Sequence, residues 1–89
     1  MTAVIDGTVI KTREALHEAL QRQLALPEYY GGTLDALYDC LTDIREDTEL
    51  RLINAQALED HLGLYFEVMH RMIHDACTDN PHLRFVVEG

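Results

Sequence analysis

The chain has 89 residues, 47% of them hydrophobic and 26% charged, a composition that excludes a disordered tail and a collagen-like repeat. This length gives room for one domain, covering residues 1–89 around one core. Seven Lys and Arg against sixteen Asp and Glu leave a formal net charge of −9, which argues against binding to nucleic acid or an anionic membrane.

The first seven residues lack the basic start and apolar run of a signal peptide, and no apolar stretch approaches the length of a membrane span. We therefore expect a cytoplasmic protein. The two cysteines, Cys40 and Cys77, form no Cys-x-x-Cys pair, so we expect reduced, half-buried thiols and no disulfide scaffold.

The first half of the chain predicts a strand followed by a helix. Residues 3–5 (Ala-Val-Ile) form a short apolar run closed by Asp-Gly, which predicts a strand and a turn, and Val9 and Ile10 could extend the strand beyond that turn. Apolar residues at helical spacing predict a helix over 13–25, which Pro27 cannot continue.

The remaining elements alternate between helical and strand patterns. After a glycine-rich loop over 28–32, the pattern predicts a helix over 34–43, a strand over 49–54, helices over 55–61 and 64–77, and a strand over 83–87. Strands separated by helices are typical of an α/β domain. We therefore expect a small parallel sheet of three strands packed with about four helices.

The negative charge is concentrated around the second predicted helix. Residues 28–49 contain seven acidic residues and one arginine, a net charge of −6. Asp35, Asp39 and Asp43 are four residues apart and share one helical face, here called the acidic ridge, opposite the leucines. Like charges at this spacing destabilise an isolated helix by about 0.2–0.5 kcal/mol per pair. The ridge therefore indicates a role outside the helix, with a solvated face as the alternative.

Tyrosines accompany this acidic segment. Tyr29, Tyr30 and Tyr38 are three of the four tyrosines in the chain. Tyrosine beside fixed charges is typical of protein interfaces, where the ring acts as an anchor. Tyr30 and Tyr38 could equally be core residues.

Residues 24–42, Leu-Ala-Leu-Pro-Glu-Tyr-Tyr-Gly-Gly-Thr-Leu-Asp-Ala-Leu-Tyr-Asp-Cys-Leu-Thr, resemble the signature segment of the barstar family, protein inhibitors of barnase-type ribonucleases. The opening Ala-Val-Ile-Asp-Gly and the Ala-Leu-His-x-x-Leu of the first helix agree with it too. The resemblance implies a three-stranded parallel sheet with helices on it. It also implies an intracellular inhibitor whose acidic helix and preceding loop block the active site of a guanyl-preferring microbial ribonuclease.

The resemblance further implies which residues contact the enzyme. On the loop and the acidic helix these are Tyr29, Gly31, Thr33, Leu34, Asp35, Tyr38, Asp39 and Thr42. Asp39 resembles the family carboxylate that takes the place of a substrate phosphate among the catalytic Arg and His of the nuclease, and Tyr29 would pack over that His. The family has one more acid on its last helix, for which Asp75 is the candidate and Glu67 or His74 the alternatives.

Several positions depart from the family pattern. Tyr38 stands where the family has Trp, Thr33 replaces an Asn, and Asp43 with Ile44 replaces Gly-Trp. These changes indicate a related small basic ribonuclease, other than barnase itself, as the best partner. The alternative is an interaction module of the same fold that binds a different basic protein. We expect the free protein to be a monomer.

Other chemistries have weaker support. His70, His74, Cys77 and His82 lie close enough in sequence to raise the question of zinc, but no Cys pair or His-Glu-x-x-His motif completes a ligand set. No nucleophile or phosphate-loop motif is present, and Cys40, beside the apolar helix face, is expected to be a structural thiol. We expect no enzymatic activity, no metal and no other cofactor.

Overall fold

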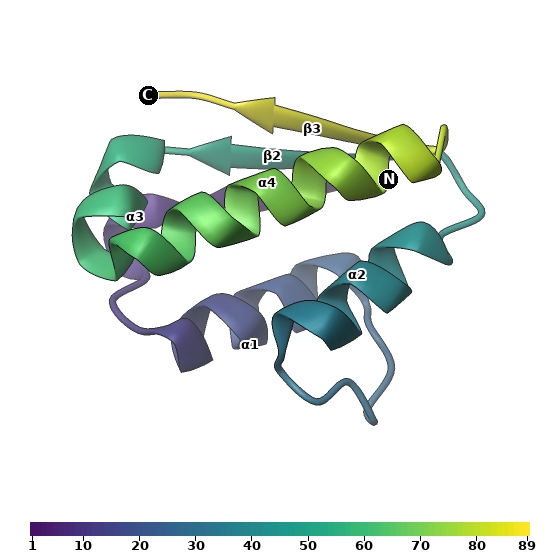
Figure 1. Ribbon diagram of the computed structural model, residues 1–89, viewed down its shortest axis with the longest axis horizontal. Coiled ribbons are helices and arrows are strands. Elements are labelled where there is room, and N and C mark those ends of the chain that lie inside the picture. Colours follow the sequence, from purple (N-terminus) through teal and green to yellow (C-terminus); the bar gives the residue numbers. More distant parts are fainter.

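The computed structural model of the protein describes residues 1–89 and contains one sheet with the strand order β1-β2-β3 (Figure 1). The strands are β1 (Thr2–Asp6), β2 (Thr48–Ile53) and β3 (Leu83–Val87), and both pairings are parallel. In register, Ile5 lies opposite Leu52, and Leu50 lies opposite Phe85. The predicted α/β fold with a three-stranded parallel sheet is confirmed.

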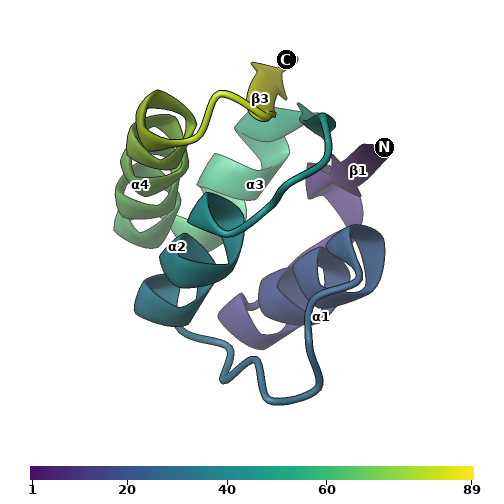
Figure 2. The same ribbon diagram turned by 90° about the vertical axis from the view of Figure 1, so that its right-hand side faces the viewer.

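Four α-helices lie on one face of this sheet (Figures 1 and 2). They are α1 (Arg13–Leu24), α2 (Leu34–Thr42), α3 (Ala55–Leu62) and α4 (Leu64–Asp79). Helix α1 packs on β1 and α4 packs on β3, while α2 packs against α4 and lies farther from the sheet. This arrangement leaves one side of α2 facing solvent.

Two predicted boundaries were wrong. Val9 and Ile10 do not extend β1, because the chain turns into a short 3-10 helix, η1 (Gly7–Val9), in which the Asp6 carboxylate accepts hydrogen bonds from the backbone and hydroxyl of Thr8. Helix α4 continues to Asp79, two residues beyond the predicted end at 77, because Asn80 at its C-cap still donates its backbone N–H to the carbonyl of Ala76.

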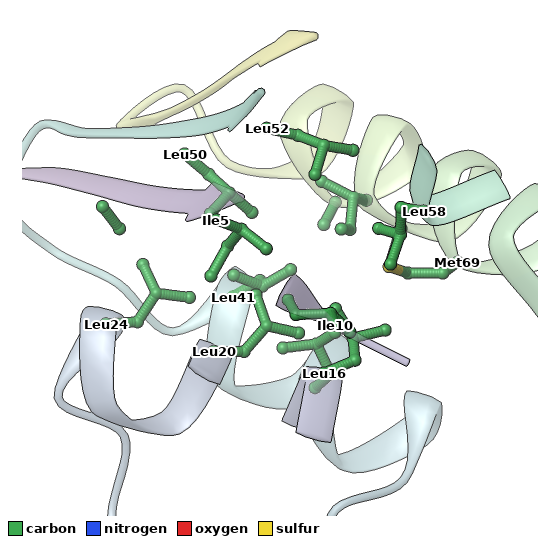
Figure 3. Close-up of a cluster of buried hydrophobic side chains, with 14 of the residues drawn as sticks. Ile5, Ile10, Leu16, Leu20, Leu24, Leu41, Leu50, Leu52, Leu58 and Met69 are labelled. Carbon is green, nitrogen blue, oxygen red and sulfur yellow. The ribbon is translucent and has the colours of Figure 1, made fainter. Parts of the chain in front are cut away.

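The core lies between the sheet and the helices. Figure 3 shows Ile5, Leu50 and Leu52 of the strands meeting the apolar side chains of the helices. Those helical side chains include Leu16, Leu20, Leu24, Leu41, Leu58 and Met69. Each fully buried leucine of this kind contributes about 1.5–3 kcal/mol through removal of its surface from water. The leucine spacing that predicted the helices therefore also defines which face of each helix is turned toward the core.

The opposite face of the sheet is not covered by a helix, which is unusual for parallel strands. Charged side chains occupy it. Arg51 donates to Glu49 at 2.9 Å and to Glu88 at 2.7 Å, and Arg84 lies 3.4 Å from Glu49. The Arg51–Glu49 pair lies within β2, whereas the Arg84–Glu49 and Arg51–Glu88 pairs connect β2 with β3 and the residue after it.

Candidate functional site

Helix α2 presents two opposite faces. Thr33 begins the helix, and its side-chain oxygen accepts a hydrogen bond from the backbone N–H of Ala36 at 3.1 Å. Leu37 and Leu41 are fully buried against the core. The acidic ridge lies on the other face and is exposed along its whole length.

The carboxylates of the ridge are free to meet a partner. Asp35 and Asp39 accept no side-chain hydrogen bond and form no ion pair within the protein, whereas Asp43 lies 3.8 Å from the exposed guanidinium of Arg45. Fixed negative charges without internal partners favour binding of a cation at this face. The ridge is therefore exposed, and Asp35 and Asp39 on it carry no internal charge partner.

The two neighbouring tyrosines of the loop before α2 point in different directions. Tyr29 is 86% exposed, and Tyr30 is 8% exposed within the core cluster. The hydroxyl of Tyr30 pairs with Nδ1 of the buried His17 on α1. Of the two alternatives for Tyr30, the structure shows the core one, and Tyr29 is the tyrosine available to a partner.

His17 joins the loop to a third element. Its Nε2 lies 2.6 Å from the hydroxyl of Tyr65 on α4, and the guanidinium of Arg13 lies 4.5 Å from the centroid of the Tyr65 ring. Burial lowers the pKa of His17, although Glu14 opposes this shift. A neutral imidazole donates through one ring nitrogen and accepts through the other, so one phenol donates to His17 and the other accepts from it.

This buried network was missed by the sequence analysis. The one available signal is that His17 lies on the apolar face of its helix, between Leu16 and Leu20, where a polar side chain needs a buried partner. Its partners, Tyr30 and Tyr65, lie 13 and 48 residues away. Through Tyr30, the network fixes the loop that precedes α2 to α1 and α4.

Two grooves border the acidic ridge. The first, the loop groove, runs between α2 and the segment after α1, and it is lined by Tyr29, Asp39, Thr42 and Asp43 among others. The second, the α2–α4 groove, is lined by Asp35, Tyr38, Asp39, Val68, Arg71, Met72 and Asp75. Asp39 borders both grooves.

The structure brings together the site residues expected from the sequence. Gly31, Thr33, Leu34 and Asp35 line a third hollow, between α1 and the start of α2. Through the shared Asp35 and Asp39, the three hollows join into one strip. The strip contains all nine residues: Tyr29, Gly31, Thr33, Leu34, Asp35, Tyr38, Asp39, Thr42 and Asp75.

Among the alternatives on the last helix, Asp75 lies in the α2–α4 groove, and neither Glu67 nor His74 lines it. Asp75 is exposed and lies close enough to Tyr38 to act on its phenol electrostatically. The geometry therefore groups Asp75 with Asp39, and this grouping could not be derived from helical spacing within either helix.

Tyr38 packs partly against the core, and its hydroxyl donates to Oδ2 of Asp79 on α4. This hydrogen bond, with burial and the nearby charges of Asp79, Asp75 and Asp39, raises the pKa of Tyr38. Asp79 was missed because the sequence predicted that the helix ends at residue 77. Its spacing of four residues from Asp75 was the available signal.

The residues considered for zinc lie in different surroundings. His70 packs between Phe66 and Phe85, and Nδ1 of His82 lies 3.0 Å from the carboxylate of Asp47. No three His, Cys, Asp or Glu side chains are placed so that they could hold a metal ion.

Neither cysteine forms a disulfide. Cys40 and Cys77 are free and half-buried, and burial raises the pKa of both thiols. A raised thiol pKa disfavours the nucleophilic thiolate. No helix combines the length and the apolar character needed to cross a membrane.

Comparison with known proteins identifies the family of the chain. The family model described as Barstar (barnase inhibitor) matches residues 1–88. Over 74 residues the chain is 38% identical to the Bacillus subtilis (strain 168) protein named "Putative ribonuclease inhibitor YrdF", and this alignment covers 82% of the chain and 81% of that protein. The match to the family extends over nearly the whole chain and confirms the resemblance in residues 24–42. The chain belongs to the barstar family.

Proposed function

We propose that the protein is a ribonuclease inhibitor that blocks the active site of a barnase-type, guanyl-preferring microbial enzyme with α2 and the preceding loop. One observation carries this proposal. The Asp39 carboxylate is exposed, has no partner within the protein, and stands between the loop groove and the α2–α4 groove.

A ribonuclease active site holds a phosphate group, so it presents converging cationic groups. The carboxylate of Asp39 can accept hydrogen bonds from such groups and contains no bond that the enzyme could cleave. Helix α2 is held by buried Leu37 and Leu41, so its carboxylates are presented with little loss of freedom on binding. The inhibition would therefore be stoichiometric and non-catalytic.

The surroundings of Asp39 fit a protein partner. Tyr29 projects beside the loop groove with its ring exposed and can pack on an aromatic or imidazole ring of the enzyme. Asp35 and Asp75 extend the negative surface along the α2–α4 groove. Together these side chains form a central acid with an aromatic anchor on one side and further acids on the other.

The test is a titration of the purified protein against barnase and several related microbial ribonucleases, with RNA hydrolysis as the measured activity. We expect a stoichiometric end point for at least one enzyme. Asp39→Asn keeps the size of the side chain but removes its charge, and it should weaken inhibition by at least about 30-fold, because the enzyme's cations then lose their charged partner.

The matched control is Asp60→Asn. Asp60 is an exposed aspartate on α3, outside the strip, so its replacement removes one charge without altering the proposed contacts. Equal effects of the two substitutions would contradict the role of Asp39. Flat titration curves for every enzyme at micromolar protein would contradict ribonuclease inhibition and favour a barstar-fold module that binds another basic protein.

A further inference from the structure

The last turn of α4 is joined to α2 by two consecutive residues. Asp79 accepts a hydrogen bond from the hydroxyl of Tyr38 at the surface. Asn80, which is buried, donates through Nδ2 to the backbone carbonyls of Leu41 at 2.8 Å and Ile44 at 3.0 Å. The C-terminal end of α2 and the side chain of Tyr38 are thus connected to the end of α4 by separate hydrogen bonds.

These two connections act on different parts of α2. The bonds from Asn80 reach the carbonyl of Leu41 in the last turn of α2 and the carbonyl of Ile44 just beyond the helix. The bond between Asp79 and Tyr38 instead acts on a side chain that lines the α2–α4 groove between Asp39 and Asp75. Only the second connection therefore controls a side chain of the strip.

The bond between Tyr38 and Asp79 is charge-assisted, because a neutral phenol donates to an ionised carboxylate. This hydrogen bond is the largest cause of the raised pKa of the Tyr38 phenol, followed by burial and the neighbouring carboxylates. A side chain held in this way loses less freedom when a partner packs on it.

We propose that Asp79 is a positioning residue of the inhibitory surface, which holds the Tyr38 ring through the phenol hydroxyl and so sets the shape of the α2–α4 groove between Asp39 and Asp75. This inference rests on the proposed function. It assigns Asp79 an indirect role, in which the residue acts through Tyr38 and needs no contact of its own with the enzyme.

The test is a double-mutant cycle with Tyr38→Phe, Asp79→Ala and the double variant, measured as inhibition constants against the ribonuclease that the wild-type protein inhibits. Each single substitution should weaken inhibition by about 3- to 10-fold, because the freed ring must be immobilised on binding. The double variant should be no weaker than the weaker single variant, because both substitutions remove the same hydrogen bond.

Asp79→Asn separates positioning from charge. The amide oxygen can still accept the phenol proton, so this variant should restore most of the inhibition that Asp79→Ala loses. The loss caused by Asp79→Ala should also persist at high salt, where a purely electrostatic contribution would be screened. Asp60→Ala is the control for removal of one surface charge.

A partner-free measurement accompanies the cycle. In NMR spectra of the protein with labelled tyrosines, Asp79→Ala should lower the pKa of Tyr38 toward its usual value of 10.0, and Asp60→Ala should leave it unchanged.

Four results would overturn the inference. If the wild-type protein inhibits a ribonuclease and Asp79→Ala inhibits it equally well, the positioning role is wrong while the proposed function stands. Additive losses in the double variant would show that Asp79 does not act through its hydrogen bond to Tyr38. A loss of inhibition in Asp79→Asn as large as in Asp79→Ala would show the same. Absence of inhibition by the wild-type protein would overturn both the proposed function and this inference.

Discussion

Tyr29 and Tyr30 are adjacent and chemically identical, yet one projects into solvent and the other belongs to the core. The difference arises from His17, which supplies a buried partner for the hydroxyl of Tyr30 but lies on another element. A phenol can be buried at low cost only where its hydroxyl is paired. The environment of a single residue thus depends on a contact that the local sequence does not contain.

Replacement of His17 should destabilise the protein in a pH-dependent way. His17→Phe fills the space of the ring but leaves the buried Tyr30 hydroxyl without its partner, so we expect the free energy of unfolding at pH 7.5 to fall by about 1–3 kcal/mol. Urea denaturation measures this value. Tyr65→Phe, which removes a less buried hydroxyl, should have a smaller effect, and the opposite order would contradict the assignment.

The pH profile follows from the lowered pKa of His17. Between this lowered pKa and the usual value of 6.5, the unfolded chain binds a proton that the folded protein does not bind. The stability of the wild-type protein should therefore fall as the pH drops below about 6.5, and His17→Phe should show less of this fall. Parallel profiles for the two proteins would contradict a depressed pKa.

Two glycines should differ in how far an added methyl group destabilises the protein. At Gly7 a Cβ atom would lie 2.2 Å from the carbonyl oxygen of Asn54 and 2.9 Å from Cβ of Leu58, so Gly7→Ala must push η1 away from α3. We expect a loss of about 1–3 kcal/mol in urea denaturation. Gly31→Ala is the control. Nothing lies within 4 Å of the Cβ position at Gly31, so the free energy of unfolding of this variant should be nearly unchanged.

At the scale of elements, α2 combines a favourable start with an unfavourable row of charges. Thr33 caps its first turn, and Asp35 lies where the helix dipole favours an anion. Asp39 and Asp43 repel each other without such compensation. The helix persists because Leu37 and Leu41 are buried. Asn80 supports its end through hydrogen bonds to the carbonyls of Leu41 and of Ile44, which follows the helix.

Removal of the cap should weaken this helix measurably. Thr33→Ala eliminates the acceptor for the backbone N–H of Ala36, and we expect the free energy of unfolding to fall by about 1 kcal/mol. Thr33→Ser retains a hydroxyl acceptor and should remain close to the wild-type protein in the same denaturation experiment. A serine variant as unstable as the alanine variant would assign the loss to the threonine methyl group instead.

At the scale of the whole molecule, the charge is unevenly distributed. Residues 28–49 hold −6 of the net −9, and the acidic ridge is exposed on one side of the fold. The open face of the sheet, by contrast, pairs Arg51 and Arg84 with Glu49 and Glu88. A basic partner is therefore attracted mainly toward α2 and the loop before it.

The long-range part of this attraction should be separable from direct contact. Asp43 is 82% exposed in its side chain and lies at the end of the ridge, so Asp43→Ala should slow association with the ribonuclease and reduce its dependence on salt, with little change in dissociation. Asp39→Ala should mainly speed dissociation. Stopped-flow measurements at several ionic strengths distinguish the two, and a larger loss of affinity for Asp43→Ala would contradict the central position of Asp39.

The sequence by itself determined the α/β class, the order of the elements, most of their boundaries and the position of the acidic ridge. Those features follow from local causes: Pro27 cannot continue α1, Thr33 caps α2, and Leu37 and Leu41 recur at helical spacing in α2. The resemblance in residues 24–42 added the family and eight candidate contact residues on the loop and α2.

Only the tertiary structure decided which side chains meet across elements. It separated Tyr29 from Tyr30 through His17, and it joined Tyr38 to Asp79 across 41 residues. It also placed Asp75, and neither Glu67 nor His74, in the α2–α4 groove with Asp39. Periodicity describes each helix about its own axis, but the rotation and depth of α2 against α4 depend on how their buried side chains pack together. That packing brings residues distant in sequence into one surface.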